Sequence, residues 1–103
     1  MENYKGKKVL VRSAEAGVYI GTMVDMQGEQ VELANVRNIW SWEGASCLSQ
    51  IANCGIKGGR VSPIVKSMVI NRCCQVMPLT EEAILNLESQ PIYGKIIYEH
   101  DNI

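Results

Sequence analysis

The sequence predicts an α+β domain in which a small, mostly antiparallel β-sheet is decorated by two short helices. Three observations predict this class: long β-branched, alternating runs over residues 7–43, apolar residues at helical spacing over about 46–53, and a second helical pattern over about 81–90. The chain has 103 residues, of which 47% are hydrophobic and 20% charged, the size and composition of one globular domain. We therefore expect a single domain over residues 1–103 with its sheet core within 7–77.

The N-terminal part of the sheet is predicted to be a three-stranded meander. Residues 7–13 form its first strand, and the other two lie on either side of Gly28, whose Q-G-E context indicates a hairpin turn. Each of the two long strands begins with alternating apolar residues, which gives it one apolar face. Trp40 and Trp42 are two residues apart, so in a regular strand they share a face, and we expect at least one of them in the core.

The first helix, about 46–53, is expected to begin at Ser46 as its N-cap and to end at Gly55. The glycine-rich residues 55–63 are predicted to form an exposed loop. A strand follows at 64–70 and runs on towards residue 77.

The second helix, about 81–90, follows Thr80 as its N-cap and ends at Pro91. Residues 91–103 are predicted to be a terminal arm or a short strand that packs on the body or on another protomer.

The cysteines indicate neither a disulfide framework nor a metal site. Of Cys47, Cys54, Cys73 and Cys74, two are adjacent, and the single histidine, His100, lies in the terminal tail. We expect reduced thiols buried as small apolar residues, with no metal and no cofactor. No apolar run approaches the ~20 residues that a bilayer span needs, and the first residues do not resemble a signal peptide, so a cytoplasmic location away from the membrane is expected.

Charge is distributed unevenly along a chain whose net charge is −1. Residues 1–72 hold nine Lys or Arg against six Asp or Glu, whereas 73–103 hold one against five. A negative total argues against binding to nucleic acid, but the cationic segment 36–72 suits a small anionic ligand or the acidic tail of a neighbouring subunit. A solvated surface is the alternative.

The chemistry-bearing residues indicate binding rather than catalysis. The sequence has no nucleophile motif and no paired acid and base, and GIKGGR lacks the spacing of a phosphate-binding loop. A helix N-terminus, an Arg and an aromatic ring can together hold a phosphate and stack on a base, which predicts a nucleotide site. For each Arg the alternative is an ion pair, and for each Trp it is packing in the core. The candidate ligand-binding residues are Arg12, Tyr19, Arg37, Trp42, Ser46 and Arg60.

Several segments, taken together, resemble a family of small domains that is found mostly in bacteriophages and prophages and has no assigned function. The segments are V-R-S (11–13), A-G-V-Y-I-G (16–21), N-V-R-N-I-W-S-W (35–42), G-A-S-C-L-S-Q-I-A (44–52) and M-P-L-T-E-E-A (77–83). The resemblance covers about residues 8–93. The chain departs from the pattern at Asn38, where a second Arg is expected beside Arg37, and in the glycine-rich loop with Arg60.

The chain is also similar to the Thoeris anti-defence proteins of phages. That similarity implies a homo-oligomeric sponge in the cytoplasm of the infected bacterium, which captures a cyclic ADP-ribose type signal or a cyclic oligonucleotide without turnover. An interaction module that inhibits a host protein is the alternative, because Tyr, Trp and Arg also dominate protein interfaces.

Overall fold

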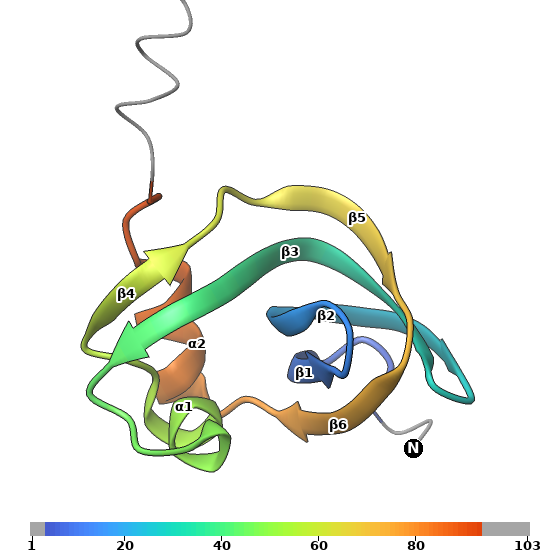
Figure 1. Cartoon of the computed structure of the whole chain (residues 1–103), viewed down its shortest axis with the longest axis horizontal. Coiled ribbons are helices and arrows are strands. Elements are labelled where there is room, and N and C mark those ends of the chain that lie inside the picture. Colours follow the sequence, from blue (N-terminus) through green and yellow to red (C-terminus); the bar gives the residue numbers. More distant parts are fainter. Residues whose placement is uncertain (1–3, 94–103) are drawn as a thin grey trace, which may run out of the picture.

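The computed structural model describes residues 4–93, and this part of the chain forms an antiparallel sheet of six strands with two short helices (Figure 1). The predicted fold class, including the three-stranded meander, is therefore confirmed. The strands are β1 (Lys8–Ser13), β2 (Gly17–Gln27), β3 (Gln30–Glu43), β4 (Gly58–Val61), β5 (Val65–Ile70) and β6 (Cys73–Pro78). The helices are α1 (Leu48–Cys54) and α2 (Glu81–Glu88).

The sheet bends into a partly open barrel. Its strands run in the order β6-β1-β2-β3, and the far edge of β3 pairs with β5 along its first half and with β4 along its second half. Only two residues separate β5 from β6, so the last strand returns to pair with the first. Figure 1 shows β3, β5 and β6 curving around β1 and β2, with α1 and α2 beside the C-terminal end of β3.

Two hydrophobic cores lie on the two faces of the central strands. Consecutive residues of β1 alternate between them, with Val9 and Val11 in the barrel interior and Leu10 against the helices, and all three are fully buried. The rest of the barrel core is Met23, Val31, Leu33, Val36, Ile70 and Cys73. The rest of the helix-side core is Val18, Ile20, Ile39, Ile51, Ile56, Val61, Ala83 and Leu87.

Two bulges in β3 change which residues face each core. Asn35, with φ 53°, lies where β3 has one residue more than β2, so Val36 enters the barrel core and Arg37 turns to the helix side. Trp40 is the extra residue opposite β4, between the pairs that Ile39 and Ser41 make. The tryptophans consequently do not share a face. Trp42 packs against the helix-side core, whereas Trp40 is 48% exposed.

Both predicted helices exist, but the cap of α1 differs from the prediction. The N-cap residue of α1 is Cys47, whose side chain makes no capping hydrogen bond. The predicted N-cap, Ser46, instead donates both its backbone N–H and its hydroxyl to Oε1 of Gln50. Gly55 ends α1 with φ 83°, as expected. Thr80 caps α2 by accepting from the N–H of Ala83 at 3.1 Å, which confirms that prediction.

The remaining differences concern the second half of the chain. The predicted loop 55–63 contains a strand, β4, because Gly59 brings its backbone against that of Ser41 where a Cβ would collide. The predicted strand 64–77 is interrupted at Arg72, which has φ 55°. Of the predicted arm, residues 94–103 lie outside the described residues, while the N–H of Tyr93 donates to the carbonyl of Val61 at 2.9 Å. Over 4–93, neither helix has the length and apolar character needed to cross a membrane.

Candidate ligand-binding site

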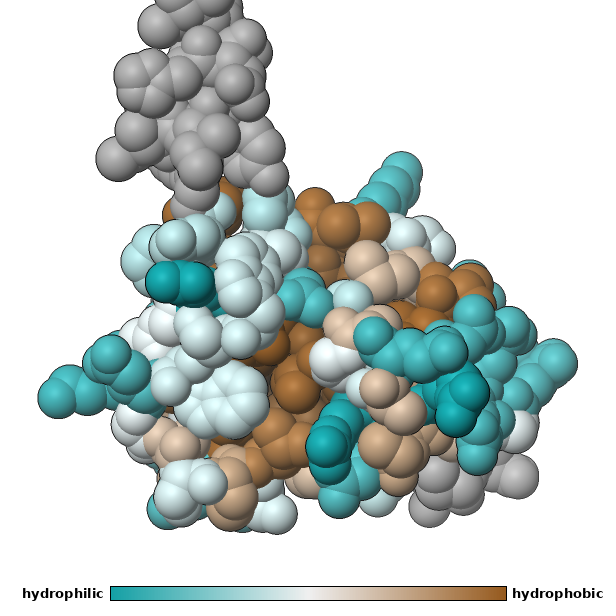
Figure 2. All heavy atoms as spheres, in the orientation of Figure 1, coloured by the Kyte–Doolittle hydropathy of each residue, from teal (hydrophilic) through white to brown (hydrophobic). Residues whose placement is uncertain are grey.

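Two of the six predicted site residues, Arg12 and Trp42, line one groove. The groove has a volume of about 430 Å³ and lies between β1, β3, β6 and the start of α1. Its lining consists of Arg12, Val18, Trp42, Cys47, Leu48, Ser49, Gln75 and Met77. We call it the Arg12–Trp42 groove. In Figure 2, hydrophobic residues are exposed along the centre of this face, between the pale residues over β3 and α1 and the hydrophilic side chains over β1 and β6.

Arg12, Trp42 and Gln75 of the groove are positioned by strands. Arg12 and Gln75 are direct partners in the pairing of β1 with β6, so they lie side by side at one wall. Trp42 comes from β3 and donates its indole N–H to the carbonyl of Ala45 at 3.2 Å, which fixes the ring. The apolar floor includes Val18, which pairs with Arg12 across β1 and β2. The groove thus combines a guanidinium, an amide and an aromatic face around an apolar floor.

Arg12 is exposed and makes no ion pair within residues 4–93. The alternative expected for it, an ion pair, is therefore not found in this part of the chain. An unpaired guanidinium beside an aromatic ring suits an anion attached to a planar group.

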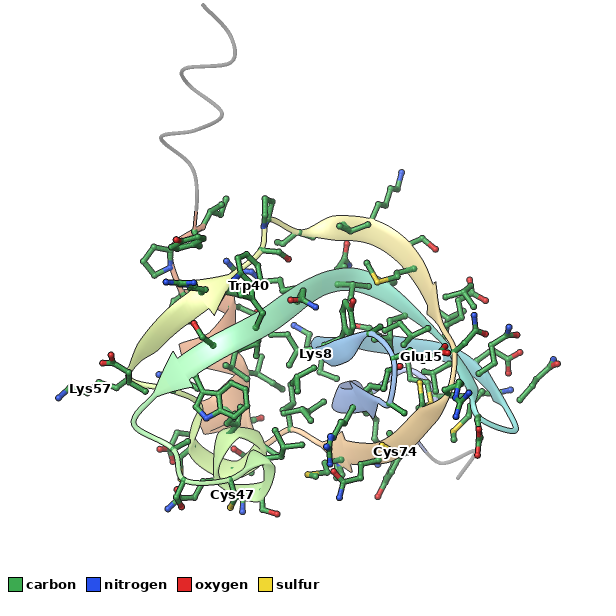
Figure 3. The ribbon with its side chains drawn as sticks, viewed as in Figure 1. Lys8, Glu15, Trp40, Cys47, Lys57 and Cys74 are labelled. Atoms are coloured by element: carbon green, nitrogen blue, oxygen red, sulfur yellow. The ribbon has the colours of Figure 1, made fainter. Side chains whose placement is uncertain are left out.

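Ser46 does not contribute the free N–H that was predicted for it. Its N–H lies 2.6 Å from Oε1 of Gln50 and is therefore already bonded, and Ser46 is not part of the groove lining. Its neighbour Cys47 does line the groove, and Figure 3 shows that thiol at the start of α1. The N–H of Ser46 is therefore not free for an anion, and an anion site at this helix end stays a prediction.

Arg37 lies outside the Arg12–Trp42 groove, and part of its side chain is bonded within the fold. It is only 4% exposed, its Nε donates to the carbonyl of Ser62 at 2.8 Å, and its Nη1 donates to the carbonyl of Leu87 at 2.9 Å. Burial lowers the pKa of this guanidinium. The bulge at Asn35 directs the side chain to the end of α2, where it donates to the carbonyl of Leu87, which also accepts from the N–H of Gln90 at 3.4 Å.

Tyr19 is also separate from the groove. It pairs with Val11, so its side chain lies on the barrel side of the sheet, where it packs against the barrel core. Arg12 and Val18 lie on the opposite face. The sequence predicts Tyr19 and Arg12 in one site because it does not reveal which face of each strand is turned towards the helices.

Arg60 belongs to an exposed cluster at the edge of β4. Its guanidinium carbon lies 5.0 Å from the centroid of the Tyr93 ring, and that ring meets Trp40 edge to face at 5.5 Å. Arg60, Tyr93 and Trp42 also line a shallow depression, so Trp42 borders both this depression and the groove. Sequence reasoning missed Tyr93 and Gln75, because only the pairing of distant segments brings them to these sites.

The cysteines differ from expectation, since Cys47, Cys54 and Cys74 are exposed and only Cys73 is buried. Burial raises the pKa of the Cys73 thiol, which packs in the barrel core. Among residues 4–93 no three His, Cys, Asp or Glu side chains are grouped so that they could hold a metal ion.

Comparison with known proteins gives one match. A protein family described as "Domain of unknown function (DUF6948)" matches residues 6–87. No curated protein and no solved structure shows significant similarity to the chain. The matched region runs from the residues before β1 into α2 and includes every residue of the Arg12–Trp42 groove.

Proposed function

The chain belongs to this family of domains of unknown function, and from that premise we propose that it is a binding protein that captures a nucleotide-derived signal without turning it over. The observation that carries the proposal is that Arg12 and Trp42, two residues far apart in the sequence, line the same groove. Gln75 adds an amide next to Arg12.

The groove offers one group for each part of a nucleotide. The Arg12 guanidinium can bind a phosphate through two parallel hydrogen bonds, and each hydrogen bond to a charged group contributes about 1.5–3 kcal/mol. The indole of Trp42 can stack on the base, which is worth about 1–3 kcal/mol. The amide of Gln75 can both donate to and accept from a base edge or a ribose hydroxyl.

The biological setting is part of the proposal. The resemblance to phage-encoded domains and to Thoeris anti-defence proteins supports a role in which the protein withholds an immune signal from its host effector, in the cytoplasm of the infected bacterium. The proposed ligands are a cyclic ADP-ribose type molecule or a cyclic oligonucleotide, and the proposed protein is a homo-oligomer. A sponge requires binding but no turnover, so a guanidinium and an aromatic ring in one groove are sufficient for it.

A thermal-shift panel of cyclic dinucleotides and trinucleotides, ADP-ribose and its cyclic isomers tests the proposal. We expect one compound to raise the melting temperature, and calorimetry on Arg12→Gln and Trp42→Leu to show weaker binding of that compound. Arg72→Gln is the matched control, because Arg72 is an exposed arginine that lies near Glu15, at 3.7 Å, and outside the groove. The bound compound should be recovered chemically unchanged. A flat panel, or equal affinity in all three variants, would reject the groove as a nucleotide site.

A second candidate function is inhibition of a host protein by direct contact. It is favoured by exposed apolar residues on and next to β5, namely Ile64, Val65 and Val69. A stoichiometric host partner in a pull-down that is lost in Val69→Lys, together with a flat nucleotide panel, would support this function instead.

A further inference from the structure

A second pocket, which shares no lining residue with the Arg12–Trp42 groove, lies between the sheet and α2. It has a volume of about 390 Å³, and the proposed function does not use it. Its walls are mainly aliphatic, and no aromatic side chain lines it. The aliphatic residues are Ile20, Ile64, Leu79, Ile84 and Leu87. The other lining residues are two cations, Lys8 and Arg37, one carboxylate, Glu88, and the uncharged residues Gly21, Thr22 and Asn35. We call it the Arg37 pocket.

Arg37 lines this pocket and carries a buried donor without a partner. Its Nε and Nη1 donate to the carbonyls of Ser62 and Leu87, but its buried Nη2 has no acceptor among the residues that the structure describes. Buried polar groups nearly always have a hydrogen-bond partner, and a guanidinium is charged at any physiological pH. The missing acceptor therefore indicates that something outside the described chain completes the site.

The charge of Arg37 is also left without a counter-ion. Between residues 4 and 93 no carboxylate lies within ion-pair distance of it, and the carboxylate of Glu88 pairs instead with Lys8. The carbonyls at the end of α2 offset part of the cost of burying this charge, but they carry only partial charges. With Lys8 and Arg37 against Glu88, the pocket has a net charge of one positive unit, which matches a monoanion.

We propose that the Arg37 pocket binds a small aliphatic carboxylate. The carboxylate accepts hydrogen bonds from Nη2 of Arg37 and from the Lys8 ammonium, and the alkyl chain lies against Ile20, Ile84 and Leu87. An aliphatic ligand is favoured over a nucleotide because the pocket offers no ring on which a base can stack.

Nη2 is closed to solvent, so a ligand in the pocket reaches it only if neighbouring side chains rotate. Lys8 and Glu88 are about half-exposed and are free to rotate. Figure 3 shows Lys8 between α2 and the paired strands β1 and β2, where its ammonium can contact a ligand in the pocket.

Binding is tested with three probes at equal ionic strength: sodium octanoate, 1-octanol and inorganic phosphate. We expect octanoate to raise the melting temperature of the wild-type chain in a concentration-dependent manner, and neither of the others to do so. An equal shift with octanol would show that the pocket selects only for an apolar chain. An equal shift with phosphate would show that it selects only for charge. Either result, or no shift with octanoate, overturns the proposal.

Substitutions then locate the site. Ile64 lines the pocket but is 61% exposed, so Ile64→Asp and its neutral match Ile64→Asn should both fold. The added carboxylate repels the ligand, and we expect octanoate to bind Ile64→Asp about fivefold or more weakly than Ile64→Asn. Equal affinity in this pair overturns the proposal.

Arg37→Lys retains the charge but lacks Nη2, and it should abolish octanoate binding, provided that circular dichroism shows it is folded. If it is unfolded, the Ile64 pair decides. Arg12→Gln, which alters only the Arg12–Trp42 groove, should bind octanoate as the wild type does. Failure of the proposed nucleotide function would therefore leave this result unaffected.

Discussion

The Arg37 guanidinium and the carbonyl of Leu87 are joined by a 2.9 Å hydrogen bond although fifty residues separate them in the chain. This bond ties the end of α2 to the middle of β3. A second donor on the same side chain reaches the carbonyl of Ser62 just after β4. One residue therefore links three elements that the sequence brings together only through folding.

Replacing Arg37 should for this reason destabilise the fold. Arg37→Met leaves the carbonyls of Ser62 and Leu87 without these donors, and we expect the free energy of unfolding to fall by about 2–4 kcal/mol. Urea denaturation followed by circular dichroism measures the change. Arg12→Met is the control, because Arg12 is exposed and should alter stability by at most about 0.5 kcal/mol. Coincident unfolding curves for the two variants would contradict this role.

The two tryptophans should differ in their contribution to stability. Trp40→Ala removes an exposed ring whose aromatic contact is the edge of Tyr93, and we expect a loss of about 1 kcal/mol or less. Trp42→Ala removes a half-buried ring packed on the helix-side core and should cost about 2–4 kcal/mol. Denaturant midpoints of the two variants give the order, and a larger loss for Trp40→Ala would show that β3 lacks the bulge at that residue.

Gly55 and Gly28 form a matched pair for testing the contact between α1 and α2. Both have positive φ, 83° and 60°. A Cβ at Gly28 meets nothing, whereas one at Gly55 collides with the side chain of Asn86, which also bonds to the backbone of Ile56. Gly28→Ala should therefore cost about 1 kcal/mol from backbone strain alone, and Gly55→Ala clearly more. Thermal unfolding distinguishes them, and equal losses would place Asn86 away from α1.

Thiol labelling should separate the four cysteines into two classes. Cys47, Cys54 and Cys74 are exposed and should react rapidly with Ellman's reagent. Cys73 should react slowly in the folded protein, because it is buried and its raised pKa keeps the thiol protonated. Mass spectrometry of the labelled peptides assigns the sites, and labelling in denaturant provides the full count. Rapid modification of Cys73 in the native state would contradict its position in the barrel core.

Asp25 gives the fold a dependence on acidic pH. Its pKa is lowered from the ordinary 3.8, first by the side-chain hydrogen bond with Lys5, whose Nζ lies 3.2 Å away. A carboxyl whose pKa is lowered on folding stabilises the protein above its unfolded pKa, and this stabilisation is lost as the pH falls below that value towards the folded pKa. Asp25→Asn should therefore flatten the stability profile below pH 3.8. A profile identical to that of the wild type would show that the pair does not persist in solution, where salt screens it.

The sequence was sufficient where a pattern is local. The meander, the Thr80 cap, the end of α1 at Gly55 and both helices follow from alternation, helical spacing and capping chemistry, and the structure contains all of them. The alternation pattern does not give the correct face for the later residues of β3, because it assumes a regular strand without extra residues. Asn35 is of a type that tolerates its positive φ, but a lone Asn in a strand pattern does not mark a bulge, and Trp40 gives no signal at all, so the sequence could not assign the faces of Arg37 and Trp42.

The candidate site was predicted in part for a related reason. The side-chain chemistry of Arg12 and Trp42 predicts them as ligand-binding residues, and the two residues line one groove. Gln75 is not predicted as a ligand-binding residue, because nothing in the sequence distinguishes one strand amide from another. Only the pairing of β1 with β6 places it beside Arg12. Ser46 and Arg37 are predicted to offer free donors, but the fold engages the N–H of Ser46 with Gln50 and all of the Arg37 donors except Nη2 with backbone carbonyls.

Strand β1 pairs on both edges, with β2 and β6, and carries three successive residues, Val9, Leu10 and Val11, that are closed to solvent. Its amides can exchange with solvent deuterium only when both the barrel and the helix-covered layer open. We therefore expect the slowest amide exchange of the molecule in β1, at rates that report global unfolding. The two layers thus behave as one cooperative unit, with β1 as the last segment to open.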